Sequence, residues 1–144
     1  MPIRIDTSAF EASVDALIVA VRDATRMGVV AGGAEIEGVA KRLVPVLSGD
    51  LRRSITTSPA EALGPGTYSV QVEPDIVYGR IIERGGTIVP KTDGGVLSWI
   101  GPDGSRLFAK KVTIQPHPYM RPSVDISGSA VRAAITVWWH SAFR

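Results

Sequence analysis

An apolar stripe in the first third of the chain sets the narrowest limit on the fold. Large apolar side chains recur at steps of four, three and four residues, at Phe10, Val14, Leu17 and Val21. This spacing places them on one face of an α-helix. The stripe continues at Ala24, Gly28, Gly32, Ile36, Val39 and Leu43. We predict a long helix over residues 8–44, which ends by Pro45 because the residue before a proline is pushed out of the helical region.

Both the start and the middle of this helix carry a specific signal. Ser8 and Glu11 have the Ser-x-x-Glu spacing of a capping box, so Ser8 is expected to be the N-cap. Gly28, Gly32 and Gly33 lie in the middle, and each glycine costs roughly 1 kcal/mol relative to alanine in a helix. Two explanations stay open. Either another helix crosses closely over this stretch, or the helix divides near residues 32–33.

Residues 45–115 are expected to form a small, mostly antiparallel sheet of about four or five strands. Ile55–Thr57 and Tyr68–Val72 are predicted to pair, with a loop over residues 59–66 between them. Further strands are expected at 87–89 and 111–114. Within the loop and hairpin of residues 90–109, the order Gly101-Pro102-Asp103-Gly104 is typical of a hairpin turn.

Three shorter segments contain residues that are typical of turns and helix ends. Ser48-Gly49-Asp50 predicts a turn that leads into a short helical turn through Arg53. Residues 78–84 predict one or two turns of helix with Gly85 as the C-cap. From Pro122 a second helix is expected over residues 122–142, with a thin, alanine-rich side that could lie over the glycines of the first helix.

These elements predict an α+β fold in a single domain over residues 1–144: a long N-terminal helix, a small mostly antiparallel sheet with a protruding hairpin, and a C-terminal helix packed on the same sheet face. A chain of 144 residues is long enough for one core and too short for two. No cysteine is present, so the sequence excludes disulfides and thiolate sites. No apolar run is long enough to span a membrane.

Catalytic chemistry is not indicated. His117 and His140 have no partner at metal-site or general-base spacing, and no glycine-rich phosphate loop or nucleophile motif is present. We therefore predict no enzyme activity, no cofactor and no metal. Glu83 is expected to form an ion pair with Arg80 or Arg84. Six basic residues define a mildly basic side of the chain: Arg22, Arg26, Lys41, Arg42, Arg52 and Arg53. This side could approach phosphate, or it could be a solvated face whose residues pair with Glu35 and Glu37.

Three segments, taken in order, carry a family resemblance. They are Pro45-Val46-x-Ser48-Gly49-x-Leu51-Arg52-x-Ser54-Ile55, then Tyr78-Gly79-x-x-Ile82-Glu83-x-Gly85, then Pro116-x-Pro118-Tyr119-Met120-Arg121-Pro122-Ser123-Val124. Together they resemble the neck and tail-completion proteins of long-tailed double-stranded DNA bacteriophages. The chain departs from that pattern where the family more often has Thr at Ser48, Ala at Gly79 and Phe at Tyr119. A glycine pair also stands at 85–86 where the family usually has Gly-Thr.

The resemblance implies a structural virion protein at the head–tail interface, made in the host cytoplasm. Such proteins form a ring, with six copies expected, that either ends tail growth or joins the finished tail to the head. The implied partners are further copies of the chain, a head connector or stopper protein and the tail tube protein, with passing contact to DNA in the channel and no membrane. A small, sequence-independent nucleic-acid-binding protein is the alternative function.

Two surfaces are predicted to contact neighbours in such a ring. The first is the hairpin, through Trp99, Pro102, Asp103, Arg106 and Phe108. The second is the C-terminal group Trp138, Trp139 and Phe143, because two adjacent tryptophans cannot both face one core. Within the subunit, Glu83 and Arg121 are expected to form a buried pair that ties the central turn to the last helix; alternatively, both are exposed and bond separately.

Overall fold

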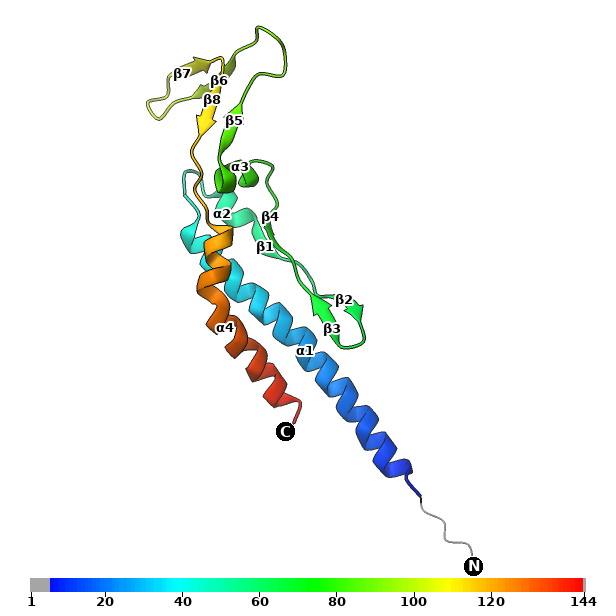
Figure 1. The fold of residues 1–144 in the computed structure, drawn as a ribbon. Coiled ribbons are helices and arrows are strands. Elements are labelled where there is room, and N and C mark those ends of the chain that lie inside the picture. Colours follow the sequence, from blue (N-terminus) through cyan, green and yellow to red (C-terminus); the bar gives the residue numbers. More distant parts are fainter. Residues whose placement is uncertain (1–5, 144) are drawn as a thin grey trace, which may run out of the picture.

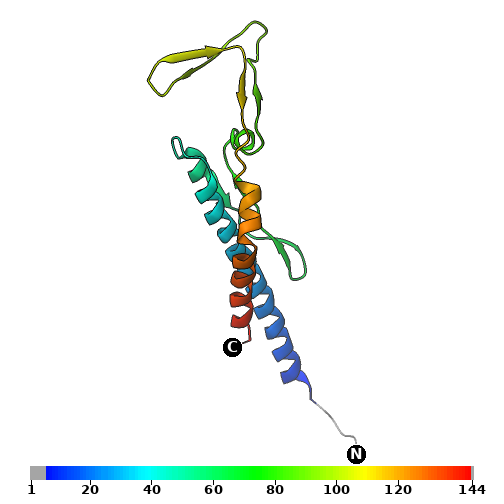
Figure 2. The ribbon, with the colours of Figure 1, turned by 60° about the vertical axis from the view of Figure 1, so that its left-hand side comes forward.

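The computed structural model describes residues 6–143 and shows an elongated molecule (Figure 1). Helix α1 (Ser8–Leu43) runs along most of its length, and α4 (Met120–Ser141) lies beside it in the opposite direction. A hairpin arm projects at the end opposite the two termini (Figure 2). The predicted class is confirmed: a long N-terminal helix, small antiparallel sheets and a C-terminal helix.

Short elements connect the two long helices. They are α2 (Asp50–Ser54), β1 (Ile55–Thr57), β2 (Glu61–Gly64), β3 (Thr67–Ser69), β4 (Val72–Pro74), α3 (Gly79–Arg84), β5 (Gly86–Ile88), β6 (Leu97–Ile100), β7 (Arg106–Ala109) and β8 (Val112–Ile114). Helix α4 begins two residues before the expected start, so Pro122 lies in its first turn. Backbone N–H groups in the first turn have no acceptor within the helix, so a proline there costs no helical hydrogen bond.

The glycines of α1 mark a close helix crossing. The helix is unbroken from Ser8 to Leu43, and α4 passes over its middle. A Cβ atom on Gly28 would lie 3.1 Å from the Cα atom of Ile135, and one on Gly32 would lie 3.0 Å from a methyl carbon of Val131. Gly33 faces the strands instead, where a Cβ would lie 2.6 Å from a methyl carbon of Thr57. The helix therefore accepts glycine because two neighbours approach its backbone.

The start of α1 differs from the predicted capping box. Ser8 is already helical, and the N-cap is Thr7, with no side-chain bond to the helix backbone. The Thr7 hydroxyl instead donates to Glu11 at 2.9 Å, and the Ser8 N–H donates to the Asp6 carboxylate at 2.9 Å. The prediction of Ser8 as N-cap is wrong because Thr7 and Asp6, one and two residues earlier, supply the polar contacts.

The strands form four separate two-stranded antiparallel ladders in place of the single sheet that we expected. Strand β1 pairs with β4, in the register Thr57 to Val72, and β5 pairs with β8. The stretch predicted as a loop contains β2, which pairs with β3, so Tyr68 lies opposite Ala62 rather than beside β1. The hairpin β6–β7 forms as predicted. With no common sheet available, α4 packs mainly against α1.

The buried core is small and lies at one end of the helix pair. Its main cluster consists of Ala40, Val44, Leu51, Ile55 and Tyr119, and Ile82 of the second motif segment packs against this cluster. The cluster residues come from the end of α1, from α2 and β1, and from the segment just before α4. The three segments that carry the family resemblance therefore meet at one junction.

Candidate assembly site

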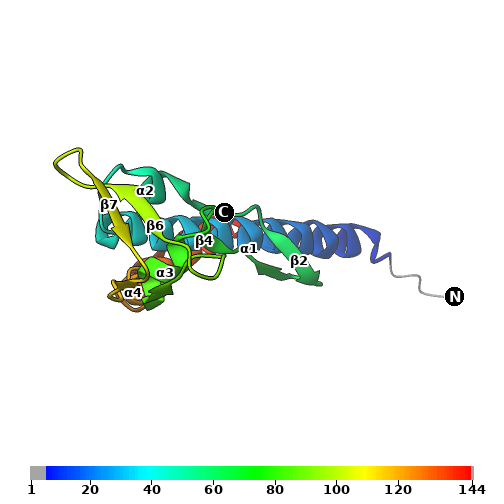
Figure 3. The ribbon, with the colours of Figure 1, turned by 90° about the horizontal axis from the view of Figure 1, so that it is seen from above.

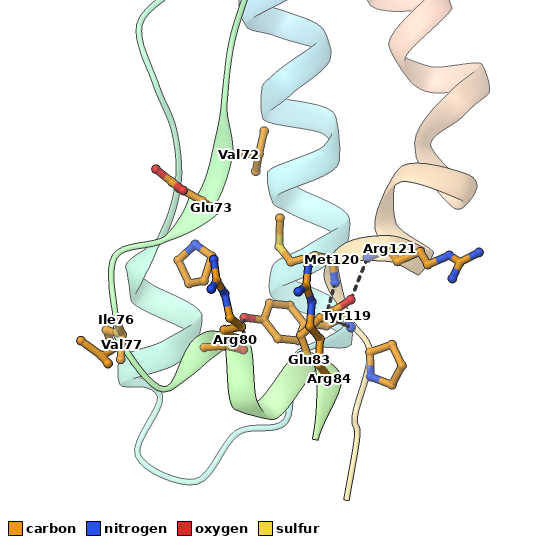
Figure 4. A pocket seen from close by; sticks show the side chains of 13 residues that line it. Val72, Glu73, Ile76, Val77, Arg80, Glu83, Arg84, Tyr119, Met120 and Arg121 are labelled. Carbon is orange, nitrogen blue, oxygen red and sulfur yellow. Dashed lines mark hydrogen bonds between the residues drawn. The ribbon is translucent and has the colours of Figure 1, made fainter. Parts of the chain in front are cut away.

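The carboxylate of Glu83 joins the central turn to the start of α4 (Figure 4). Its two oxygens accept the backbone N–H groups of Tyr119 at 2.7 Å, Met120 at 2.9 Å and Arg121 at 3.1 Å. The first N–H groups of a helix have no partner within the helix, and a negative charge there also interacts favourably with the helix dipole. A residue 36 positions earlier thus caps α4.

The expected side-chain pair between Glu83 and Arg121 is not formed. Glu83 does contact Arg121, as predicted, but through the backbone N–H of Arg121. The Arg121 guanidinium extends away from Glu83 (Figure 4). The prediction of an ion pair between Glu83 and Arg80 or Arg84 is also wrong. None of the ion pairs within 4 Å over residues 6–143 includes any of these three residues. The carboxylate oxygens are occupied by three backbone donors, which sequence spacing does not reveal.

Further backbone contacts hold the same junction together. Gly85 ends α3 with φ 70°, and a Cβ there would lie 2.9 Å from the Ile114 carbonyl oxygen and from the Pro116 nitrogen. The backbone N–H of His117 donates to the Ile82 carbonyl at 2.8 Å. The proline-rich segment that includes Pro118 therefore runs directly along α3 before α4 begins.

The side chain of Tyr119 fills the centre of this junction. It is completely buried, and its hydroxyl donates to the Gly79 carbonyl at 3.2 Å. A Cβ on Gly79 would lie 3.1 Å from that hydroxyl and 2.7 Å from a ring carbon of Pro74. Burial, together with the nearby charge of Glu83, raises the pKa of Tyr119, so the phenol stays neutral.

We expect Tyr119→Phe to lower the free energy of unfolding by about 1 kcal/mol, because one buried hydrogen bond is lost while the ring packing remains. Urea unfolding followed by circular dichroism measures this change. In the same assay Gly79→Ala should destabilise the parent protein more than it destabilises the Tyr119→Phe variant, because the added methyl then no longer meets a hydroxyl. Additive effects of the two substitutions would contradict this packing.

Glu83 also makes the stability depend on pH. Burial raises its pKa, but the N–H groups of Met120, Tyr119 and Arg121 together with the charge of Arg84 lower it by more, so it lies below the ordinary 4.5. Glu37 behaves similarly, because a hydrogen bond from Lys41, against the effect of burial, and further bonds from Thr57 lower its pKa. A carboxylate with a depressed pKa in the folded state stabilises the fold above its unfolded pKa and loses this effect as the pH falls through the folded value.

We therefore expect the thermal midpoint to be constant near neutral pH and to fall as the pH drops below about 4.5. The Glu83→Gln variant should show a shallower fall between about pH 5 and about pH 3, since glutamine does not titrate, and a lower midpoint at neutral pH. Thermal unfolding across this range measures both slopes. Parallel curves for the two proteins would show that Glu83 does not contribute.

The first motif segment supplies a turn and part of the core. Gly49 adopts φ 82° just before α2. The Ser48 hydroxyl donates to the Asp50 carboxylate, and its oxygen accepts the Asp50 backbone N–H at 3.4 Å. Leu51 is buried in the core, whereas Arg52 is exposed. Tyr78 precedes α3 and remains partly exposed.

The residues predicted as contact surfaces are exposed. On the hairpin, Trp99 and Phe108 are 41% and 62% exposed, and the turn that contains Pro102 is closed by bonds from Ser105 to Asp103. Arg106 begins β7 and is exposed as well. The C-terminal group is also exposed, at Trp138, Trp139 and Phe143.

Sequence reasoning missed a third exposed surface, on the first turns of α1. Phe10, Val14 and Leu17 begin the predicted apolar stripe, and each is exposed. Figure 3 shows the first turns of α1, in blue, extending beyond the other elements. The lengths of the two helices could have revealed this. At about 1.5 Å per residue, the 36 residues of α1 span roughly 54 Å and the 22 residues of α4 roughly 33 Å. The shorter helix cannot cover the longer one.

Three of the six residues on the predicted basic side form ion pairs with acidic residues, and of the two expected partners only Glu37 takes part. Ion pairs join Arg26 to Asp23, Lys41 to Glu37 and Arg53 to Asp50, which supports a solvated face for these residues. In the part of the chain that the structure describes, no group of three or more histidine, cysteine or acidic residues could hold a metal ion. Among residues 6–143, no helix combines the length and apolar character needed to cross a membrane.

A comparison with protein families gives one match. A family model described as "Bacteriophage HK97-gp10, putative tail-component" matches residues 8–85, more than half of the chain. The matched range runs from the start of α1 to the glycine that ends α3. Neither a curated protein nor a solved structure matches the chain significantly.

Proposed function

The chain belongs to the HK97-gp10-like family of bacteriophage tail components, and on that premise we propose that it forms a ring at the head–tail interface of the virion. The ring, with six copies expected, completes or terminates the tail and joins it to the head connector. Its neighbours are then the connector or stopper protein on one side and the tail tube protein on the other. The role is structural, with DNA passing through the channel.

The observation that carries this proposal is the large exposed surface of the isolated chain. It exposes 10703 Å², whereas a compact monomer of the same mass exposes roughly 7,100 Å². The excess of about 3,500 Å² is in the range that two obligate interfaces bury on one subunit. A subunit within a closed ring has two such interfaces, one with each neighbour.

The proposal is tested in the phage that encodes the chain, by electron microscopy of particles made with a stop codon in this gene, with and without complementation. Filled heads lying apart from finished tails are the expected result and would assign the joining role. Abnormally long tails would assign tail termination. Normal infectious particles would contradict the proposal.

The two predicted contact surfaces are tested on the purified protein. We expect Trp139→Ala, and separately deletion of the exposed turn residues 102–104, which leaves a two-residue connection between β6 and β7, to reduce the mass of the assembled species in light scattering. Each removes exposed apolar or turn residues outside the core, so thermal unfolding should remain close to that of the parent protein. Unchanged assembly in both folded variants would show that neither surface forms the subunit contact.

A further inference from the structure

The start of α1 is a helix with one uncovered apolar face and only acidic charges. Every residue from Ser8 to Val19 is exposed, and Phe10 is 71% exposed. We refer to residues 6–19 as the tip segment. Its charged side chains are Asp6, Glu11 and Asp15, with no lysine or arginine. The apolar face continues the stripe that α4 covers farther along, so it is a helix-packing surface without a partner in the same chain.

At the other end of α1, a concave surface has the opposite character. A pocket of about 1030 Å³ lies between β4, α3 and the start of α4, and we call it the arginine pocket. Arg80 and Arg84 extend into it from α3 (Figure 4). No carboxylate in residues 6–143 lies within 4 Å of either guanidinium, since Glu83 is bound to backbone N–H groups. Three arginines and two glutamates line the pocket, because Arg121, Glu73 and the backbone-bound Glu83 lie there as well, so its charge is net positive. The other lining residues are mostly apolar: Val72, Pro74, Ile76, Val77, Gly79, Pro118, Tyr119 and Met120.

The charges of the two surfaces match in sign and spacing. Glu11 and Asp15 are four residues apart on α1, and Arg80 and Arg84 are four residues apart on α3. Like charges at this spacing repel each other on a helix. The Glu83 carboxylate offsets part of this repulsion at Arg84, but it is held by backbone N–H groups and forms no ion pair with either arginine. Each pair spans about 6 Å along its helix axis. Two acidic groups of the tip segment can therefore face two arginines while apolar residues beside them meet.

The contact cannot form within one chain. The tip segment and the arginine pocket lie at opposite ends of α1, with about 25 residues, or roughly 40 Å, of continuous helix between Asp15 and the core residue Ala40. We propose that the tip segment of one copy docks in the arginine pocket of the next copy. This head-to-tail contact joins two different patches and closes into a ring when the rotation between copies permits. The inference rests on the proposed ring and specifies its contact.

Charge exchange tests this pairing in the full-length protein. One variant carries Glu11→Arg and Asp15→Arg, and a second carries Arg80→Glu and Arg84→Glu. Each alone places like charges in the contact, so we expect at least about 100-fold weaker assembly in light scattering and analytical ultracentrifugation. Mixed in equal amounts, the variants can alternate around a ring with every contact complementary. Assembly of the mixture should therefore return.

A cross-link tests the geometry independently, since the chain contains no cysteine. Mixing Val14→Cys with Val77→Cys should give a disulfide-linked dimer under mild oxidation, because Val77 is fully exposed at the arginine pocket. The matched control is Val14→Cys with Leu63→Cys, an exposed position on β2, which should not cross-link. All substituted positions are exposed, and thermal unfolding verifies that each variant folds. If the charge variants fail to fold, the cysteine pair alone decides.

Four outcomes would overturn the contact. In the assembly assays, these are a wild-type chain that stays monomeric at millimolar concentration, charge variants that assemble as well as wild type, and a mixture of the two variants that does not assemble. In the cross-linking assay, it is an equal yield of disulfide-linked dimer from the control pair. Rings that persist in both charge variants would remove this contact and leave the proposed ring intact. Loss of DNA binding with unchanged assembly after Arg80→Glu and Arg84→Glu would assign the pocket to phosphate.

Discussion

Replacement of Glu83 by alanine should lower the free energy of unfolding by about 3–4 kcal/mol, because three N–H groups at the start of α4, those of Tyr119, Met120 and Arg121, lose their charged acceptor. Charge-assisted bonds contribute more than neutral ones, and Tyr119, whose N–H is one of the three, is completely buried. Urea unfolding followed by circular dichroism at neutral pH measures the change.

Two controls separate the cap from a general effect of losing a charge. Glu83→Gln keeps one side-chain oxygen as an acceptor and should lose about half as much stability. Glu35→Ala removes an exposed carboxylate from α1 and should change stability by less than about 0.5 kcal/mol. If Glu83→Ala behaved like Glu35→Ala, the three N–H groups would have to find acceptors elsewhere.

Gly28→Leu should destabilise the protein by about 4 kcal/mol or more, or prevent the two long helices from packing. Leucine favours helix more than glycine does, so α1 itself would be strengthened. The loss comes only from the crossing, where a Cβ would lie 3.1 Å from the Cα atom of Ile135 and the backbone of α4 would have to move. Urea unfolding and near-ultraviolet circular dichroism report stability and packing together.

Gly38→Ala provides the matched control in the same helix. The nearest atom to its added Cβ is an Arg42 side-chain nitrogen at 3.7 Å, which is an ordinary contact. We expect this substitution to stabilise the protein by about 0.5–1 kcal/mol through helix propensity. Equal effects at Gly28 and Gly38 would show that α4 does not cross α1 at Gly28.

Sequence reasoning succeeded where a few neighbouring residues determine the structure. The hairpin at 97–109 follows from its turn residues, and the end of α3 follows from Gly85. The role of Glu83 depends on N–H groups 36 positions away, and nothing in the spacing indicates that a carboxylate accepts backbone donors there. For the candidate contact surfaces, the exposed hairpin and terminal tryptophans could be selected from sequence.

The uncovered face of α1 and the arginine pocket could not be predicted from the sequence as contact surfaces. Periodicity identifies an apolar face, but it does not identify what covers that face, so Phe10 and Ala24 carry the same signal although only Ala24 is buried. The pocket combines residues from β4, α3 and α4 that only the folded chain brings together. The strands were also too short, at three or four residues, to indicate their partners.

The crossing of α4 over Gly28 has a consequence for synthesis of the chain. Gly28 and Ile135 meet in space but are more than a hundred positions apart in sequence. A ribosome that adds about 5–20 residues per second needs roughly 5–20 s to make the intervening chain. Throughout this interval the apolar face of the nascent first helix has no α4 to cover it, so we expect ribosome-associated chaperones to bind there until the last helix emerges.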